Sequence, residues 1–212
     1  MVSERRALKR KTDFQIISEW IAPGSRVLDL GCGRGVFAER LQQALGCHVV
    51  GVDVDLEKVQ HCVARGVNVY QRDIAEALRA FGPGSFDWVV CSRTLQQLQE
   101  PNEVLDLALR VGRHFVVGFV NDAFWRNRWC HLVYGRRVIN EVFPEPWHRS
   151  RPSNPVTIES FAAYCREAGI PIERTAFLSG DWHSPQRFWP NLLAGYAIFE
   201  LTGRAASNTA SA

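Results

Sequence analysis

The chain has 212 residues, of which 46% are hydrophobic and 22% charged, and its formal net charge is +3. This length and composition are typical of one α/β domain that buries its own core without disulfides or metals. A net charge of +3 is too small to indicate a nucleic-acid partner. No run approaches the roughly 18 to 20 apolar residues of a membrane helix, so we expect no membrane segment.

Six cysteines are scattered along the chain, without a C-x-x-C pair or a zinc-type Cys/His spacing. Several lie inside apolar stretches, so we predict buried free thiols in a reducing compartment and no metal site. The first eleven residues are charged and no signal-peptide pattern follows them. Together these features favour a cytoplasmic protein.

Hydrophobic periodicity predicts alternating strands and helices along the first 120 residues. A helix over about 12–21 comes first and ends before the Pro23-Gly24 pair. This alternation is typical of a parallel sheet covered by helices on both faces. The predicted strands are 25–30, 47–54, 67–71, 86–91 and 115–119, and the predicted helices are 36–45, 56–65, 75–81 and 102–111, the last with Asn102 as N-cap.

After Val120 the alternation loosens, and residues 121–155 predict an ordered insertion or lid rich in tryptophan, arginine and proline. A helix over 157–168, with Thr157 as a possible cap, precedes two strands over 170–177 and 196–201, which we expect to pair antiparallel at the sheet edge. The expected fold is therefore a Rossmann-like doubly wound α/β sheet of about seven strands, mostly parallel with an antiparallel edge strand. It forms one domain over 1–203, followed by a disordered tail over 204–212.

The run Val27-Leu-Asp-Leu-Gly-Cys-Gly-Arg-Gly35 has G-x-G-x-G spacing, unlike the G-x-G-x-x-G of dinucleotide sites. Its glycines allow a sharp turn from strand to helix and close approach of a ligand. The helix start near Val36 favours a carboxylate or phosphate. Asp29 would repel a pyrophosphate but can accept hydrogen bonds from an ammonium group. The pattern favours a cofactor that carries an amino acid, with a tight turn that binds no ligand as the alternative.

Two further acids follow predicted strands. Asp53 ends the second strand, where a carboxylate in a doubly wound sheet accepts the ribose hydroxyls of a cofactor. Asp55 is a nearby alternative, although its position suits the cap of the helix that starts at Leu56. Asp73 ends the third strand and could accept from an adenine amino group, with Ile74 against the ring. It could equally cap the helix over 75–81.

These motifs resemble those of the class I S-adenosylmethionine (SAM) dependent methyltransferases. The resemblance implies SAM as cofactor, with the glycine loop around the methionine moiety, Asp53 at the ribose and Asp73 at the adenine. The residues assigned to the cofactor are Asp29, Gly31, Cys32, Gly33, Asp53, Val54, Asp73, Ile74 and Ser92.

A narrower resemblance covers nearly the whole chain and points to the MetW family of methionine-biosynthesis proteins. It implies an association with homoserine O-acyltransferase. The chain departs from the family pattern at 147–154 and at Arg93, where glutamine is usual, which leaves partner and substrate open. The segments that carry the resemblance are 13–17, 64–69, 92–96, 110–113, 125–128 and 188–194.

No catalytic residue is assigned, because methyl transfer from a sulfonium can proceed by proximity and orientation alone. The function stays open between a MetW-type protein, a small-molecule methyltransferase with an unidentified acceptor, and, more weakly, a fold that has lost SAM and binds only proteins. The cluster Trp125-Arg-Asn-Arg128 either packs under a loop or binds an acidic partner. Candidates for an acid or base are Ser92, Arg93, Asn121, Asp122, His131 and His148.

Overall fold

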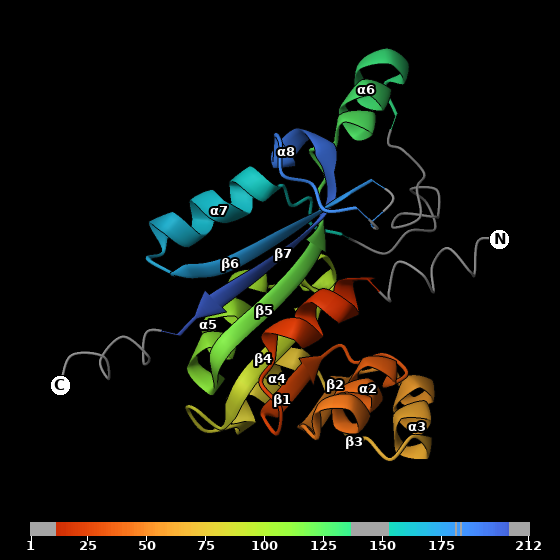
Figure 1. Cartoon of the computed structure of the whole chain (residues 1–212), viewed down its shortest axis with the longest axis vertical. Coiled ribbons are helices and arrows are strands. Elements are labelled where there is room, and N and C mark those ends of the chain that lie inside the picture. Colours follow the sequence, from red (N-terminus) through yellow and green to blue (C-terminus); the bar gives the residue numbers. More distant parts are fainter. Residues whose placement is uncertain (1–11, 137–152, 181, 183, 204–212) are drawn as a thin grey trace.

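The computed structural model describes residues 12–136, 153–180, 182 and 184–203. Within them, seven strands form one sheet in the order β3-β2-β1-β4-β5-β7-β6 (Figure 1). The strands are β1 (Arg26–Leu30), β2 (His48–Asp53), β3 (Asn68–Gln71), β4 (Phe86–Ser92), β5 (Gly112–Val120), β6 (Ile172–Ser179) and β7 (Ala194–Thr202).

The first five strands pair parallel with their neighbours, whereas β7 pairs antiparallel with both β5 and β6. The predicted doubly wound sheet with an antiparallel pair at its edge is therefore confirmed. The order reverses between β1 and β4, since the chain builds outward to β3 before it returns to β4. In such sheets ligands bind at the carboxyl ends of the strands beside this switch point.

Helices cover both faces of the sheet, and each face has its own apolar core. One core packs side chains of α4 (Ile74–Ala80), α5 (Pro101–Val111) and α7 (Ile158–Glu167) against the sheet. The opposite core packs an N-terminal helix over 12–20, α2 (Val36–Leu45) and α3 (Leu56–Ala64). The strands serve both cores because successive side chains alternate: Trp88 and Val90 of β4 enter the second core, and Val89 enters the first.

Some predicted boundaries were wrong. The cap position of α5 is Glu100 rather than Asn102, because Pro101 takes the first helical position, where its missing N–H is not needed. Thr157 is confirmed as the cap of α7, with Ser160 in a reciprocal capping box. The prediction missed η1 (Leu95–Gln97) and α8 (Pro190–Leu193), which are too short for a periodic pattern.

Of the expected insertion over 121–155, the described part contains α6 (Trp125–Tyr134). Its role as a lid stays a prediction, and the tail over 204–212 lies outside the described residues. The six cysteines are unpaired and five are buried, as expected. Among the described residues no helix has the length and apolar character to cross a membrane, and no cluster of His, Cys, Asp or Glu is arranged to hold a metal ion.

Candidate cofactor-binding site

A cavity of about 520 Å³ lies at the carboxyl ends of β1, β2, β3 and β4, beside the switch point. It is the place where this architecture is expected to hold a ligand. Asp29, the ninth predicted site residue, is buried and is not part of the lining. The predicted residues that line the cavity together are Gly31, Cys32, Gly33, Asp53, Val54, Asp73, Ile74 and Ser92.

The glycine loop turns the chain from β1 into α2. Gly31, Gly33 and Gly35 all have positive φ, at 71°, 60° and 74°, a region that other residues enter only with strain. The backbone N–H of Gly31 donates to Val52 O over 2.8 Å, which fixes the loop to β2. A side chain at Gly33 would meet nothing within 4 Å, so this stretch of backbone is open to a ligand.

Gly35 is the position where the loop lies closest to α3. A Cβ there would stand 3.0 Å from the sulfur and 3.2 Å from the Cα of Cys62, and the second of these atoms belongs to the backbone. We expect Gly35→Ala to lower the free energy of unfolding by about 2 kcal/mol, of which about 1 kcal/mol is left-handed strain. Gly46→Ala is the matched control, because Gly46 has φ 63° and open space around it. Denaturant titration measures both, and equal losses would show that the close approach to α3 contributes nothing.

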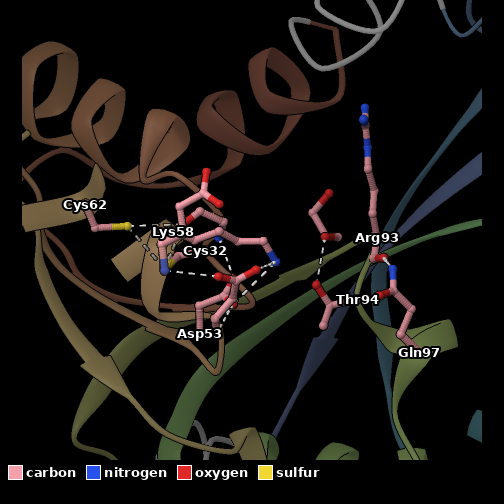
Figure 2. Close-up of polar contacts among 11 residues, drawn as sticks. Cys32, Asp53, Lys58, Cys62, Arg93, Thr94 and Gln97 are labelled. Carbon is pink, nitrogen blue, oxygen red and sulfur yellow. Dashed lines mark hydrogen bonds and ion pairs between the residues drawn. The ribbon is translucent and has the colours of Figure 1, made fainter. Parts of the chain in front are cut away.

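Asp53 is almost completely buried at the end of β2, and its carboxylate organises the loops around it (Figure 2). Its Oδ2 accepts from the Gly33 N–H and its Oδ1 from the Asp55 N–H, both over 3.0 Å. Lys58 Nζ lies 3.5 Å from the same Oδ1. The carboxylate therefore links the glycine loop to the start of α3, and Oδ2 keeps acceptor capacity toward the cavity.

Asp55 and Asp73 both cap helices. Asp55 accepts from the Glu57 N–H at the start of α3, as expected. Asp73 accepts from the N–H groups of Ala75 and Glu76 at the start of α4, and it also lines the cavity. Both capping bonds end on Oδ1, so Oδ2 of Asp73 takes part in neither of them. The two interpretations of Asp73 are therefore compatible.

Asp29 lies within the apolar layer behind the loop. Burial, together with the nearby charge of Asp53, raises the pKa of its carboxyl to about 7. It is thus poised to change its protonation state near neutral pH. A cation that reached it would hold it in the ionised form.

Ser92 belongs to a buried polar cluster that the sequence did not reveal. Its hydroxyl lies 3.0 Å from the Tyr196 hydroxyl and 3.4 Å from a carboxylate oxygen of Asp13. Asp13 is completely buried and forms an ion pair with Arg93, whose Nη2 lies 2.7 Å from Oδ2. The cluster joins the N-terminal helix to the end of β4, at the wall of the cavity.

Arg93 was named from the sequence as a departure from the family pattern and as a candidate acid or base, and the structure places it in an ion pair with Asp13. Its guanidinium carbon lies 4.8 Å from the ring centroid of Trp182, so the side chain is held by an aromatic face as well as by Asp13. The side chain points away from Asp53 (Figure 2). Arg93 also has a positive φ of 63°, which only a fixed environment maintains in a residue of this size.

Two thiols meet beneath the glycine loop. The sulfurs of Cys32 and Cys62 are 3.7 Å apart, and the Cys62 thiol donates to Gly33 O over 3.2 Å (Figure 2). Burial raises the pKa of both thiols, which keeps them protonated. The sequence separation of 30 residues hid this contact. Only the packing of α3 against the loop creates it.

Three further candidates for an acid or base, Asn121, Asp122 and His131, lie away from the cavity. Asn121 is completely buried, where its amide donates to the carbonyls of Asn191 and Ala194. Asp122 accepts from the Val156 N–H, and His131 lies exposed on α6. His148 lies outside the described residues. Among the candidates that the structure describes, Ser92 and Arg93 line the cavity, whereas Asn121, Asp122 and His131 do not.

Solved structures match this fold over nearly the whole chain. A SAM-dependent methyltransferase from Archaeoglobus fulgidus superposes with a TM-score of 0.66 at 18% identity, covering 93% of this chain and 94% of the other. Magnesium protoporphyrin IX methyltransferase from Synechocystis, solved with bound SAH, gives 0.69 at 17% identity, covering 96% of this chain and 87% of the other. The chain therefore has the class I methyltransferase fold.

Two sequence relatives point to different roles. The bifunctional methionine biosynthesis protein MetXA/MetW of Rhodopirellula baltica is 30% identical over 179 residues, which is 80% of this chain but 29% of that protein. The ubiquinone biosynthesis O-methyltransferase of Cupriavidus pinatubonensis is 31% identical over 159 residues, 70% of this chain and 61% of that protein. The chain thus spans less than two thirds of the length of either relative, 29% of the first and 61% of the second.

A family model described as methionine biosynthesis protein MetW matches residues 11–201. The match runs from the N-terminal helix through the glycine loop and the cavity to β7. This chain belongs to the MetW family.

Proposed function

We propose that the chain binds SAM in the cavity beside the glycine loop. The observation that carries the proposal is the convergence of eight residues, picked from the sequence for this cofactor, on one cavity of about 520 Å³. That volume lies within the usual range for cofactor sites. The open backbone at Gly33 gives a ligand of this kind room for close contact.

The chain's own groups suit the parts of SAM. Asp53 Oδ2 would accept from a ribose hydroxyl of bound SAM, and Asp73 Oδ2 would accept from its adenine amino group. The amides at the start of α2 would suit the carboxylate of SAM, and Asp29 behind the loop would attract its ammonium group. SAM, when bound, supplies an electrophilic methyl group on its sulfonium. The protein contributes orientation and exclusion of water, which suffice for transfer to a strong acceptor.

The biological role that we propose is support of methionine biosynthesis together with homoserine O-acyltransferase. The bifunctional MetXA/MetW relative favours it, because a MetW part there shares one chain with a MetXA part. A small-molecule methyltransferase with an unidentified acceptor is the second candidate. The ubiquinone O-methyltransferases favour this one, since they match more than two thirds of the chain at similar identity.

For the cofactor, we expect Asp53→Ala to weaken SAM binding about 100-fold, equivalent to about 2.7 kcal/mol, because a charge-assisted hydrogen bond is lost and the loop loses its anchor. Asp55→Ala is the matched control. It removes an equal charge two residues away and costs α3 its cap, with an affinity change of at most about threefold. Titration calorimetry measures both variants, and equal affinity in wild type and Asp53→Ala would remove Asp53 from the site.

For the role, the two candidates differ in what accompanies the protein. A pull-down with the homoserine O-acyltransferase of the same organism, with mass spectrometry of bound small molecules, is expected to yield a complex that contains SAM or SAH. Absence of a complex, with turnover of SAM in the presence of an acceptor, would contradict the first candidate in favour of the second.

A further inference from the structure

Helix α6 presents an apolar stripe to solvent. Trp125, Trp129, Leu132 and Val133 follow the i, i+4, i+7, i+8 spacing that places side chains on one side of a helix. They are 47%, 57%, 80% and 48% exposed. Figure 1 shows α6 projecting from the sheet beyond the end of β5. A stripe of four large apolar side chains is typical of a helix that lies in a partner's groove.

The stripe is not what attaches α6 to the rest of the molecule. Asn127 is the buried side chain of this helix, and its amide donates to Asp122 O over 3.2 Å. Arg128 Nε donates to Ala123 O over 2.7 Å. These polar contacts hold the helix at its root. Within the apolar stripe, the Trp125 ring has an edge contact with Phe124, at 6.0 Å between centroids, and about half or more of each of the four side chains stays exposed.

A second pair of exposed aromatic rings stands beside this root. Phe188 and Trp189 are 79% and 75% exposed, in the connection that leads into α8. The Asn121 amide ties the two segments together, because it precedes α6 and donates to the Asn191 carbonyl of α8. Trp189 has φ 43°, a strained conformation for a bulky residue, and its side chain is 75% exposed. We call the four α6 residues together with Phe188 and Trp189 the aromatic face.

The two segments that carry the aromatic face are basic. Residues 123–136 and 184–193 contain no aspartate or glutamate but carry four arginines. A second copy of the same face would place like charges together, whereas a partner with an acidic rim compensates them. A fixed geometry on two separate segments suits a shaped protein groove better than a fluid lipid surface. The four arginines are Arg126, Arg128, Arg136 and Arg187.

We infer that the aromatic face docks the acyltransferase, in an apolar groove with aspartate and glutamate at its rim. This inference rests on the proposed function and adds a location to it. Tryptophan and arginine are the residues that most often dominate binding energy at such interfaces. The bifunctional MetXA/MetW relative is the reason for naming the acyltransferase as the partner. This chain matches 29% of that protein, and the other 71% lies outside the match.

The test uses the full chain and the separately purified homoserine O-acyltransferase of the same organism. Surface plasmon resonance is expected to show about tenfold or greater loss of affinity for Trp129→Ala and for Leu132→Ala. Arg126→Glu is expected to slow association and to reduce its dependence on salt. Tyr70→Ala and Val63→Ala are matched controls, since these residues are 54% and 64% exposed on β3 and α3 and are expected to leave the affinity unchanged. Unaltered melting and SAM affinity would show that the variants fold.

Three results would overturn the inference. If the complex forms and the α6 variants bind as wild type does, another face is used, while the proposed function stands. If wild type forms no complex, the proposed partnership itself fails. If Trp129→Ala instead abolishes dimerisation in sedimentation, or binding to vesicles of phosphatidylcholine with 30% phosphatidylglycerol, the occupant is a second copy or a lipid surface.

Discussion

Arg93→Leu is expected to lower the free energy of unfolding by about 3 kcal/mol at pH 8. Asp13 is completely buried, and Arg93 is the cation that pairs with it. Removal of the guanidinium leaves a buried carboxylate that still accepts from the Phe14 N–H and the Ser92 hydroxyl but has lost its paired cation. Leucine has a side chain of similar volume, and it is strained at the positive φ of position 93 much as arginine is. The loss of unfolding free energy therefore measures mainly the missing charge.

The loss should depend on pH. Burial already raises the pKa of Asp13 although Arg93 opposes the shift, and without Arg93 that pKa rises further. A carboxyl whose folded pKa is raised loses stability as pH rises above its unfolded value near 3.8. The deficit of Arg93→Leu relative to wild type should therefore be small near pH 4 and grow toward pH 8. Urea unfolding at several pH values measures it.

The control for this variant is Arg79→Leu, which breaks an exposed ion pair with Glu103. Exposed pairs contribute at most about 1 kcal/mol, so this variant should change little. Equal losses in the two variants would contradict the compensating role of Arg93. The double variant Asp13→Leu/Arg93→Leu should recover part of the stability, because neither charge then stays buried alone.

Much of the fold follows from local pattern, and the cavity follows from topology. Asp53 could be predicted because an apolar run stops at this acid. Asp73 could be predicted because it comes two residues after the third strand. Parallel pairing then brings the ends of these strands to one edge of the sheet. The glycines of the loop could be predicted because sharp turns with positive φ favour glycine. Their positions in the chain thus carry most of the site.

What the sequence did not reveal depends on long-range packing. Asp13 and Arg93 are 80 residues apart, and nothing local marks an acid on an amphipathic helix as buried. The contact between the two thiols beneath the loop and the exposure of the α6 stripe were missed for the same reason, because both depend on long-range packing. An apolar i, i+4, i+7 spacing predicts a helix but does not say whether the stripe faces a core or solvent.

Asp29→Asn is expected to make the protein more stable at neutral pH, by up to about 4 kcal/mol above pH 7. The pKa of Asp29 is near 7 in the folded chain and 3.8 without burial, and each unit corresponds to about 1.4 kcal/mol. Between those values the unfolded carboxyl ionises while the folded one keeps its proton, so wild type loses stability as pH rises. Asparagine does not titrate. The gain should therefore be near zero at pH 4, grow toward pH 7 and then level off.

Asp87→Asn provides a control of opposite sign. The hydrogen bond from Arg26 lowers the pKa of Asp87, so its contribution is present at neutral pH and lost as pH falls. This variant should be less stable than wild type at pH 7 and match it in acid. If the stabilities of Asp29→Asn and Asp87→Asn relative to wild type change with pH in the same direction, burial is not the cause of the Asp29 effect.

The same titration distinguishes a structural Asp29 from one that meets the cofactor. If the ammonium group of SAM reaches the carboxyl, binding ionises Asp29, and up to one proton is released at pH 6 to 7. Calorimetry in two buffers of different ionisation enthalpy counts that proton, and it should be missing in Asp29→Asn. Asp29 lies behind the cavity lining rather than on it. If wild type and Asp29→Asn release the same number of protons, SAM does not change the protonation of Asp29. The carboxyl would then be a buried group with a stability cost and no role in binding.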